Sequence, residues 1–303
     1  MSIRLPESPI DDAAFAPREP EARTNWQLFR RRFLRHRMAL LSIAVLVILM
    51  IACYGAPWLA PHKQGAQNLL DGDLSPSLKH IFGTDDLGRD QLSEIMYAGR
   101  ISLTIGLVVA LLSTVVGVTI GAVAAYYSGW TDQLLSALVD LVLILPDLAL
   151  LGVAVQHFGH GDTSIILVLV ALSWTYLARL VRAQVLSLKE KEFVEAARAS
   201  GASATRILVR HIVPNCLGII MVNATLTVAA AISTEAALSF LGLGVQPPQN
   251  SWGRMLADAE PYAVSSSKFY LVFFPGFMLL LTILAVNFLG DALRDAFDPQ
   301  SRF

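Results

Sequence analysis

Long runs of hydrophobic residues alternate with shorter polar segments along most of this chain. A helix needs about 20 mainly apolar residues to cross the hydrocarbon core of a bilayer. Six runs reach that length, so the pattern predicts an all-α membrane protein with six transmembrane helices. The predicted spans cover residues 39–60, 101–127, 133–156, 163–184, 212–234 and 269–290.

The composition agrees with a membrane location. Of the 303 residues, 54% are hydrophobic and 16% are charged, and the mean hydropathy is +0.56. Soluble domains contain about 25% charged residues. The first apolar run begins only after residue 38 and is too long for a cleavable signal peptide, so we interpret it as a retained span.

Basic residues mark one side of the predicted membrane protein. Lysine and arginine gather in 26–38, in 189–211 between the fourth and fifth spans, and in the tail 291–303. The positive-inside rule places these segments, and with them both termini, in the cytoplasm. The acidic segment 61–100 and the loop 241–268 then lie on the other side of the membrane.

Two different segments precede the first span. Residues 1–25 are rich in Pro, Glu, Asp, Ala and Arg, a composition typical of a disordered tail. In 26–38, aromatic and leucine side chains interleave with arginines, which predicts an amphipathic basic helix on a membrane surface. An arm that binds nucleic acid is the alternative, but the adjoining span makes it the weaker interpretation.

Motifs for catalysis, nucleotide binding and metal binding are missing from the sequence. No P-loop is present, and no His or Cys pair has the spacing typical of a metal site. We therefore expect no catalytic residue, metal or cofactor in this chain. Cys53 and Cys216 fall near opposite membrane faces, so we expect no disulfide between them.

The polar segment 189–215 predicts a helix, a turn and a second helix. Residues 189–200 contain good helix formers without Gly or Pro. Gly201 then provides a helix end, because glycine adopts the left-handed conformation that a C-cap needs. Ser203 is a suitable N-cap for the second helix, which runs into the fifth span.

This segment resembles the EAA loop of ABC importer permeases. The matching residues are Glu195, Ala196, Ala197, Gly201 and Pro214. The resemblance implies that residues 189–211 form a coupling loop that docks into a groove on a cytoplasmic ATPase. The alternative is a basic amphipathic helix that lies on lipid headgroups.

The outer segment predicts a tight turn followed by a short helix before the second span. In the turn, we expect Asp85 or Asp86 to accept hydrogen bonds from backbone amides. The order FGTDxxGRD at 82–90, together with GRISL at 99–103, resembles the C-type permease subunit of dipeptide and oligopeptide ABC importers. The turn residues are Gly83, Thr84, Asp85, Gly88, Arg89 and Asp90.

The resemblance extends over roughly 26–300 and implies a type I ABC importer permease fold. It implies a bacterial inner-membrane subunit paired with a second permease and two ATP-binding subunits. ATP and Mg²⁺ would bind only those subunits. An extracytoplasmic binding protein would deliver a peptide substrate, and the spans, surrounded by lipid, would form the translocation pathway.

Two carboxylates fall inside the third predicted span. A charge at this depth is costly, so Asp140 and Asp147 should face the bundle interior or a watery cavity. On a continuous helix their spacing places both on one face, although Pro146 can kink that helix. They are candidates for the translocation pathway, or they bond structurally to neighbouring groups. Glu235 is likewise a pathway group or a cap for the loop that follows it.

Other residues in the apolar regions predict packing. Gly117 and Gly121 have the spacing that permits close helix approach in lipid, although glycine is frequent in membrane helices by chance. Arg179 and Arg182, near the cytoplasmic end of the fourth span, support the coupling loop or extend toward headgroups. Trp252 is expected at the membrane interface.

Other functions compete with a peptide importer. Related permeases move nickel or glutathione, and the sequence does not exclude these substrates. A proton-coupled secondary transporter would use Asp140 and Asp147 as a relay, but it leaves the polar loop unexplained. A membrane-embedded enzyme is disfavoured because no nucleophile and base occur at a recognisable spacing.

Overall fold

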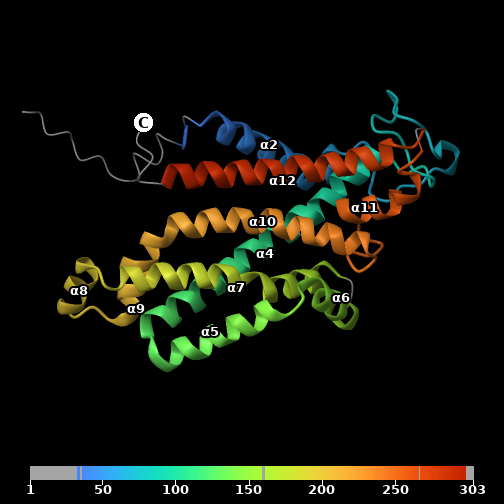
Figure 1. Ribbon diagram of the computed structural model, residues 1–303. Coiled ribbons are helices and arrows are strands. Elements are labelled where there is room, and N and C mark those ends of the chain that lie inside the picture. Colours follow the sequence, from blue (N-terminus) through green and yellow to red (C-terminus); the bar gives the residue numbers. More distant parts are fainter. Residues whose placement is uncertain (1–32, 35, 159–160, 266, 298–303) are drawn as a thin grey trace, which may run out of the picture.

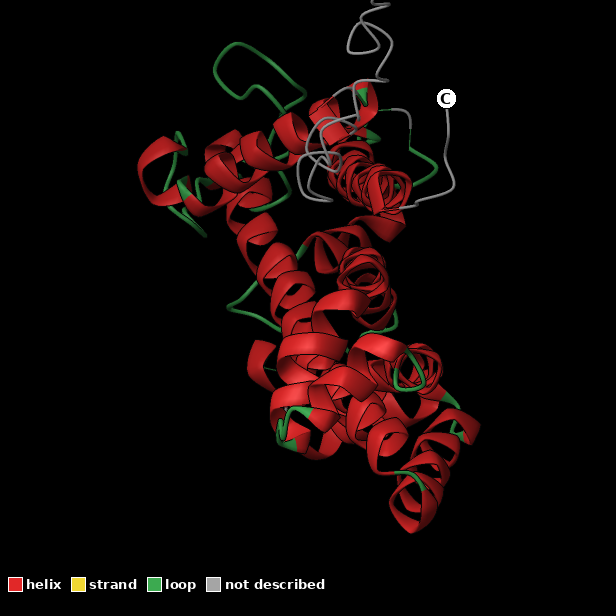
Figure 2. Ribbon diagram, turned by 90° about the vertical axis from the view of Figure 1, so that its left-hand side faces the viewer, coloured by secondary structure: helices red, strands yellow, loops and turns green. Residues whose placement is uncertain are grey.

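The computed structural model describes residues 33–34, 36–158, 161–265 and 267–297, and this part of the chain is helical without strands (Figure 2). The expectations for 1–25 and for most of 26–38 lie outside it. The helices labelled in Figure 1, with α3, are α2 (Arg37–Tyr54), α3 (Ala56–Leu59), α4 (Gln91–Tyr127), α5 (Gly129–Ile144), α6 (Asp147–Phe158), α7 (Asp162–Leu188), α8 (Glu192–Ala199), α9 (Ala204–Ile207), α10 (Leu217–Phe240), α11 (Trp252–Ala259) and α12 (Tyr270–Phe297).

Among the described residues, 5 helices are long and apolar enough to cross a membrane. They are α2, α4, α7, α12 and the continuous helical stretch Ala204–Phe240, which contains α9 and α10. Each corresponds to one predicted span. α12 extends to Phe297, beyond the predicted end of the last span at 290.

The third predicted span is not one helix. α5 ends at Ile144, Leu145 adopts an extended conformation with ψ of 137°, and α6 begins only at Asp147. The residue before a proline avoids the helical region for steric reasons, and Pro146 supplies that restriction here. The interpretation that Asp140 and Asp147 share one helix face is therefore wrong, because the break separates them.

The second span begins earlier than predicted. α4 has 37 residues and starts at Gln91, so the separate short helix expected in the outer segment is the first part of α4. Asp90 caps this helix: its Oδ2 accepts hydrogen bonds from the Ser93 amide at 2.9 Å and the Ser93 hydroxyl at 2.7 Å. A capping carboxylate also suits the positive end of the helix dipole.

α4 packs most extensively against α7, and glycines make the close approach possible. A Cβ atom on Gly117 would lie 2.7 Å from the Trp174 carbonyl oxygen, and one on Gly121 would lie 2.3 Å from the Ala178 carbonyl oxygen. Both distances are far below a van der Waals contact with rigid backbone. The prediction that these glycines serve helix packing is confirmed.

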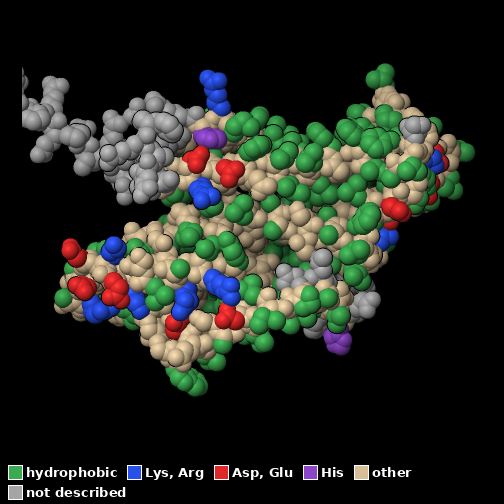
Figure 3. Space-filling view, in the orientation of Figure 1, with side chains coloured by type: hydrophobic (Ala, Val, Ile, Leu, Met, Phe, Trp, Pro, Cys, Tyr) green, Lys and Arg blue, Asp and Glu red, His purple; other side chains and the backbone are tan. Residues whose placement is uncertain are grey.

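The remaining long helices surround α4. α10 packs against α4 and α12, and α2 packs against α12 (Figure 1). The α8 end of the molecule contains α8, α9 and the start of α2, whereas the α11 end contains α11 and residues 60–90. On the face drawn in Figure 3, hydrophobic side chains dominate between these ends, and most charged side chains gather toward the α8 end. Cys53 and Cys216 are both buried, and neither forms a disulfide.

Candidate functional site

The segment 189–211, which we term the coupling segment, contains the predicted helix, turn and helix. α8 spans Glu192–Ala199 and ends in a Schellman motif, in which Gly201 has φ of 76°. The Gly201 amide donates to the Arg198 carbonyl at 3.0 Å, and the Ala202 amide donates to the Ala197 carbonyl at 3.1 Å. The predicted role of Gly201 as a helix end is confirmed.

The second helix starts directly after Ser203, the predicted N-cap. The Ser203 hydroxyl accepts a hydrogen bond from the Arg206 amide at 3.4 Å, and α9 begins at Ala204. The chain continues through a π-helical turn (Leu208–Ile212) and a 3-10 turn into α10. Pro214 lies exposed in that 3-10 turn, so it joins the coupling segment to the fifth span without a loop.

One face of α8 is anchored and the other is free of covering groups. Val194 is 0% exposed and belongs to a cluster that includes Val185 of α7 and Ile207 of α9. Glu195 and Ala196, the next two residues, are exposed. The helix therefore presents a carboxylate and a small side chain outward while its buried face holds it against the bundle.

Ala197 and Gly201 complete the predicted set at this position. Ala197 is half-buried and packs against the same apolar cluster as Val194, whereas Gly201 is exposed. The structure thus places Glu195, Ala196 and Ala197 on α8 and Gly201 in the turn that ends it. Pro214 lies further along the chain, at the start of the next long helix.

Polar contacts tie the predicted cytoplasmic end of α7 to α5 and to the junction between α4 and α5. Arg182 binds Asp132 through two hydrogen bonds, Nε to Oδ1 at 2.6 Å and Nη2 to Oδ2 at 2.7 Å. Lys189 donates to the Ser128 hydroxyl at 2.7 Å and to the Ala125 carbonyl at 3.2 Å. Asp132 was not predicted from the sequence, although an acidic residue in a first helical turn is a recognisable signal.

Asp140 lies beside a cavity between α4, α5 and α7. The cavity has a volume of about 350 Å³ and is also lined by Arg179. Arg179 Nη2 lies 2.6 Å from Asp140 Oδ1, and both side chains are more than half exposed in this chain alone. Asp140 is therefore an ion-paired group at a cavity. Asp147 is the first residue of α6, and its side chain lies outside what the structure describes.

Glu235 organises the loop after α10. Its side chain is fully buried, and its Oε1 accepts hydrogen bonds from the Ser239 and Ser251 hydroxyls at 2.7 Å each. Ser239 also accepts a hydrogen bond from the Val245 amide at 3.3 Å, and Ser251 caps α11. These contacts favour the loop role of Glu235 over a pathway role.

Trp252 is buried inside the protein rather than facing outward. Its side chain is 0% exposed, and its indole Nε1 donates to the Ile95 carbonyl of α4 at 3.0 Å. The expected outward-facing position is not found because the loop folds back and packs one face of α11 against α4, α10 and α12. A buried tryptophan needs such an internal acceptor for its N–H group.

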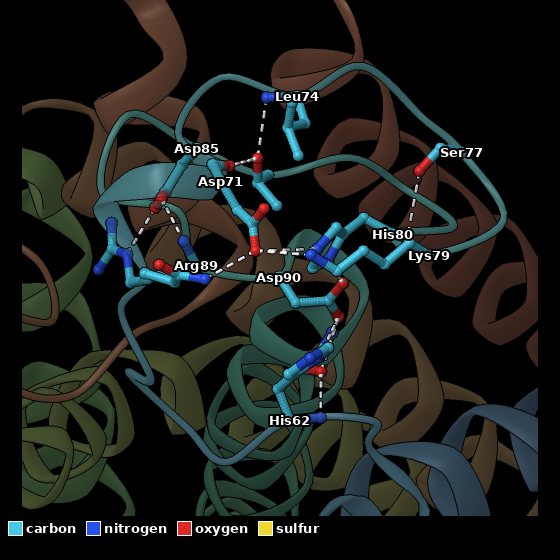
Figure 4. A network of polar contacts seen from close by, with 12 residues as sticks. His62, Asp71, Leu74, Ser77, Lys79, His80, Asp85, Arg89 and Asp90 are labelled. Atoms are coloured by element: carbon cyan, nitrogen blue, oxygen red, sulfur yellow. Dashed lines mark hydrogen bonds and ion pairs between the residues drawn. The ribbon is translucent and has the colours of Figure 1, made fainter.

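The outer turn forms as predicted and belongs to a larger polar network (Figure 4). Asp85 Oδ1 accepts hydrogen bonds from the amides of Leu87 at 3.0 Å and Arg89 at 2.8 Å. Gly88 has φ of 70°, and a Cβ atom there would overlap the backbone of Asn68. Asp85 is thus the carboxylate that satisfies the turn amides.

Comparison with known proteins matches nearly the whole chain. Residues 117–303 match the family "binding-protein-dependent transport system inner membrane component", and residues 24–76 match the "N-terminal TM domain of oligopeptide transport permease C". The oligopeptide transport system permease protein OppC of Haemophilus influenzae is 40% identical over 284 residues, which are 93% of this chain and 91% of that protein. The dipeptide transport system permease protein DppC of Bacillus subtilis is 40% identical over 272 residues, covering 90% of this chain and 85% of that protein.

A solved structure has a similar fold. An inward-facing form of the MetNI methionine ABC transporter aligns with a TM-score of 0.55 and 18% identity, covering 65% of this chain and 93% of the other. At this identity the likeness concerns the fold alone.

Proposed function

Because the chain belongs to the family of binding-protein-dependent transport system inner membrane components, we propose that it is the C-type permease subunit of a bacterial ABC importer for dipeptides or oligopeptides. The names of the relatives OppC and DppC support the peptide substrate. The observation that carries the coupling role is the outward-facing pair Glu195 and Ala196 on a helix whose opposite face is anchored by Val194.

Coupling follows from how α8 is attached. A partner that binds the exposed face of α8 moves a helix whose buried side chain is packed against α7 and α9. α7 is itself tied to α5 by the Arg182–Asp132 pair. Packed side chains and rigid helices transmit such displacements because cores resist compression. Motion of the partner is thus passed to the helices that enclose the cavity.

Partner subunits bind ATP and deliver the peptide in this proposed function. Two ATP-binding subunits, which carry ATP and Mg²⁺, dock on the coupling segments of this chain and of a second permease. An extracytoplasmic binding protein delivers peptide at the α11 end. The chain lies in the inner membrane with both termini and the coupling segment in the cytoplasm, an orientation supported by the basic residues of 189–211. It performs no chemistry itself.

The pathway is proposed to include Asp140 and Asp147. Asp140 lies at the cavity between α4, α5 and α7, where its pairing with Arg179 offers a carboxylate that a peptide amino group can compete for. Replacing Asp147 by Asn, and separately Asp140 by Asn, should lower uptake of cationic peptides more than that of neutral ones. Equal uptake of both peptide classes by a variant would remove that residue from the pathway.

The coupling role is tested by copurification from the native membrane. The wild-type chain should retain two ATP-binding subunits and a second permease, whereas Glu195→Arg should lose the ATP-binding subunits. Glu260→Arg is the control, because Glu260 is also exposed but lies at the α11 end. Peptide transport by this chain alone in liposomes, without any ATP-binding subunit, would refute the proposal.

A further inference from the structure

Two histidines and an aspartate from separate parts of the outer segment meet beside the start of α4. His62 follows α3, His80 lies in the loop before the tight turn, and Asp90 caps α4. Figure 4 shows their side chains gathered in one network. One ligand atom from each of the three residues lies within 4.8 Å of the other two.

We propose that His62, His80 and Asp90 bind a divalent transition-metal ion, and that Zn²⁺ fits the site. A tetrahedral Zn²⁺ with ligands at about 2.0–2.1 Å keeps neighbouring ligand atoms roughly 3.3 Å apart. His80 Nδ1 lies 2.9 Å from Asp90 Oδ1, and His62 Nδ1 lies 3.8 Å from Asp90 Oδ2. The first contact is a hydrogen bond that the ion would replace, and the second runs to the other carboxylate oxygen. Small side-chain rotations would therefore have to bring the three ligand atoms to tetrahedral spacing.

The donor set and its burial suit such an ion. Imidazole nitrogen and carboxylate oxygen are both ligands that Zn²⁺ accepts. The side chains of His80 and Asp90 are 4% and 3% exposed, whereas that of His62 is 42% exposed. The site therefore has two buried ligands, one exposed ligand on the side from which an ion can enter, and a fourth position that water can fill.

A second observation points to the same ion. The His80 Nε2 atom is buried and has no hydrogen-bond partner among the described residues. It faces Asp71 Oδ2 at 3.9 Å, and Asp71 is held by Lys79 at 2.8 Å and Asn68 at 2.7 Å. Histidines that bind metal through one nitrogen usually donate the other N–H to a carboxylate, which fixes the ring. Asp71 is placed to accept that bond once the ring turns.

The Asp90 carboxylate is held in place before the first turn of α4. Its Oδ1 lies 2.9 Å from His80 Nδ1, and its Oδ2 accepts hydrogen bonds from the Ser93 amide and hydroxyl. A bound ion would also tie residues 62–80 to the first turn of α4, and so would stabilise the α11 end.

The test measures metal bound to the purified, assembled transporter after chelator treatment and titration with Zn²⁺. At Zn²⁺ concentrations near the wild-type Kd, wild type should bind more ion per complex than His62→Ala and should gain thermal stability. The variant's affinity should fall at least about tenfold, since losing even an outer partner costs that much. His62 is half exposed, so its loss leaves the fold intact. His211→Ala, at the α8 end, is the matched histidine control.

Two further results decide the proposal. Titration with Co²⁺ should give wild type the visible absorption of a tetrahedral site, and His62→Ala should lack it. Asp71→Asn should weaken Zn²⁺ binding by about 10-fold to 100-fold, as expected when a histidine loses its outer partner. Zn²⁺ binding that is undetectable in wild type, or equal in wild type and His62→Ala, would overturn the proposal.

Discussion

The outward face of α8 and the outer turn at the α11 end differ in whether their polar side chains have partners within the described part of the chain. At the α8 end, Glu195 and Ala196 are exposed, and the Glu195 carboxylate forms no ion pair or hydrogen bond within the described part of the chain. The Ala196 carbonyl accepts a hydrogen bond only from the neighbouring Ser200 hydroxyl, at 2.8 Å, among the side chains described. At the α11 end, Asp85 and Asp90 each accept several hydrogen bonds, and Tyr270 donates to the Thr84 carbonyl at 2.7 Å.

Under the proposed coupling role, the outward face of α8 is a surface for a partner, whereas the polar groups of the outer turn are satisfied within the chain. A buried polar group needs a partner within the chain, and the α11 end supplies it through side chains distant in sequence. The polar groups on the outward face of α8 need no partner within the chain, because water or another protein can form hydrogen bonds with them. Substitutions on that face should therefore change function more than stability. Substitutions of the hydrogen-bonded groups at the α11 end should change stability more than function.

The largest effect on stability is expected beneath the α8 end, from Gly121→Ala. The added Cβ would lie 2.3 Å from the Ala178 carbonyl oxygen, so α4 and α7 must separate. We expect a loss of about 2–3 kcal/mol, typical of overpacking, measured as a lower unfolding midpoint in detergent. Gly276→Ala in α12 is the control, since its Cβ would make an ordinary contact at 3.7 Å. Equal midpoints for the two variants would contradict the proposed packing constraint.

A functional effect without a stability effect is expected from Ala196→Trp. Ala196 is exposed, so the folded chain accommodates the indole, but a docked partner does not. ATP-dependent peptide uptake should fall at least about tenfold, which corresponds to about 1.4 kcal/mol of coupling, with an unchanged unfolding midpoint. Uptake equal to wild type would show that α8 does not dock through this face.

A matched pair of glycines sharpens the comparison. Gly201 and Gly242 have φ of 76° and 77°, and a Cβ on either would meet nothing within 4 Å. Alanine at either position should cost about 1–2 kcal/mol of local stability, because L-residues resist the left-handed region. Only Gly201→Ala should also reduce uptake, because only Gly201 shapes the coupling segment. Equal uptake by the two variants would show that the bend at Gly201 has no part in coupling.

The smallest effect is expected at the α11 end in acid. A carboxyl group whose pKa is lowered by folding, as for Asp90, stabilises the fold above its unfolded pKa of about 3.9. That contribution is lost as the pH falls through the folded pKa. Hydrogen exchange of the first turn of α4 should therefore accelerate below about pH 4, beyond the intrinsic pH effect seen for α8. Asp90→Asn should abolish this additional pH dependence.

Local signals in the sequence predicted local structure correctly. Gly201 and Ser203 define the end of one helix and the start of the next through bonds within a few residues, so their roles follow from residue type. Gly117 and Gly121 were recognisable from spacing, and Asp85 from turn chemistry.

Features that depend on the fold could not be predicted. Trp252 is buried because α11 folds back onto α4, which no local pattern specifies. The cluster of His62, His80 and Asp90 has no short spacing, because the loop brings its members together. Proline at position 146 predicts a kink, but the extent of the break depends on how α5 and α6 pack against α7.

The break before Pro146 divides the third predicted span into two helices that can turn relative to each other. α5 and α6 each retain their own internal hydrogen bonds, and the Leu150 amide donates to the Pro146 carbonyl at 3.0 Å. Rotation at Leu145 can change the angle between α5 and α6 without breaking a helical hydrogen bond, because proline has no backbone N–H to donate at this position. The wall beside the cavity can thus change its angle at little enthalpic cost.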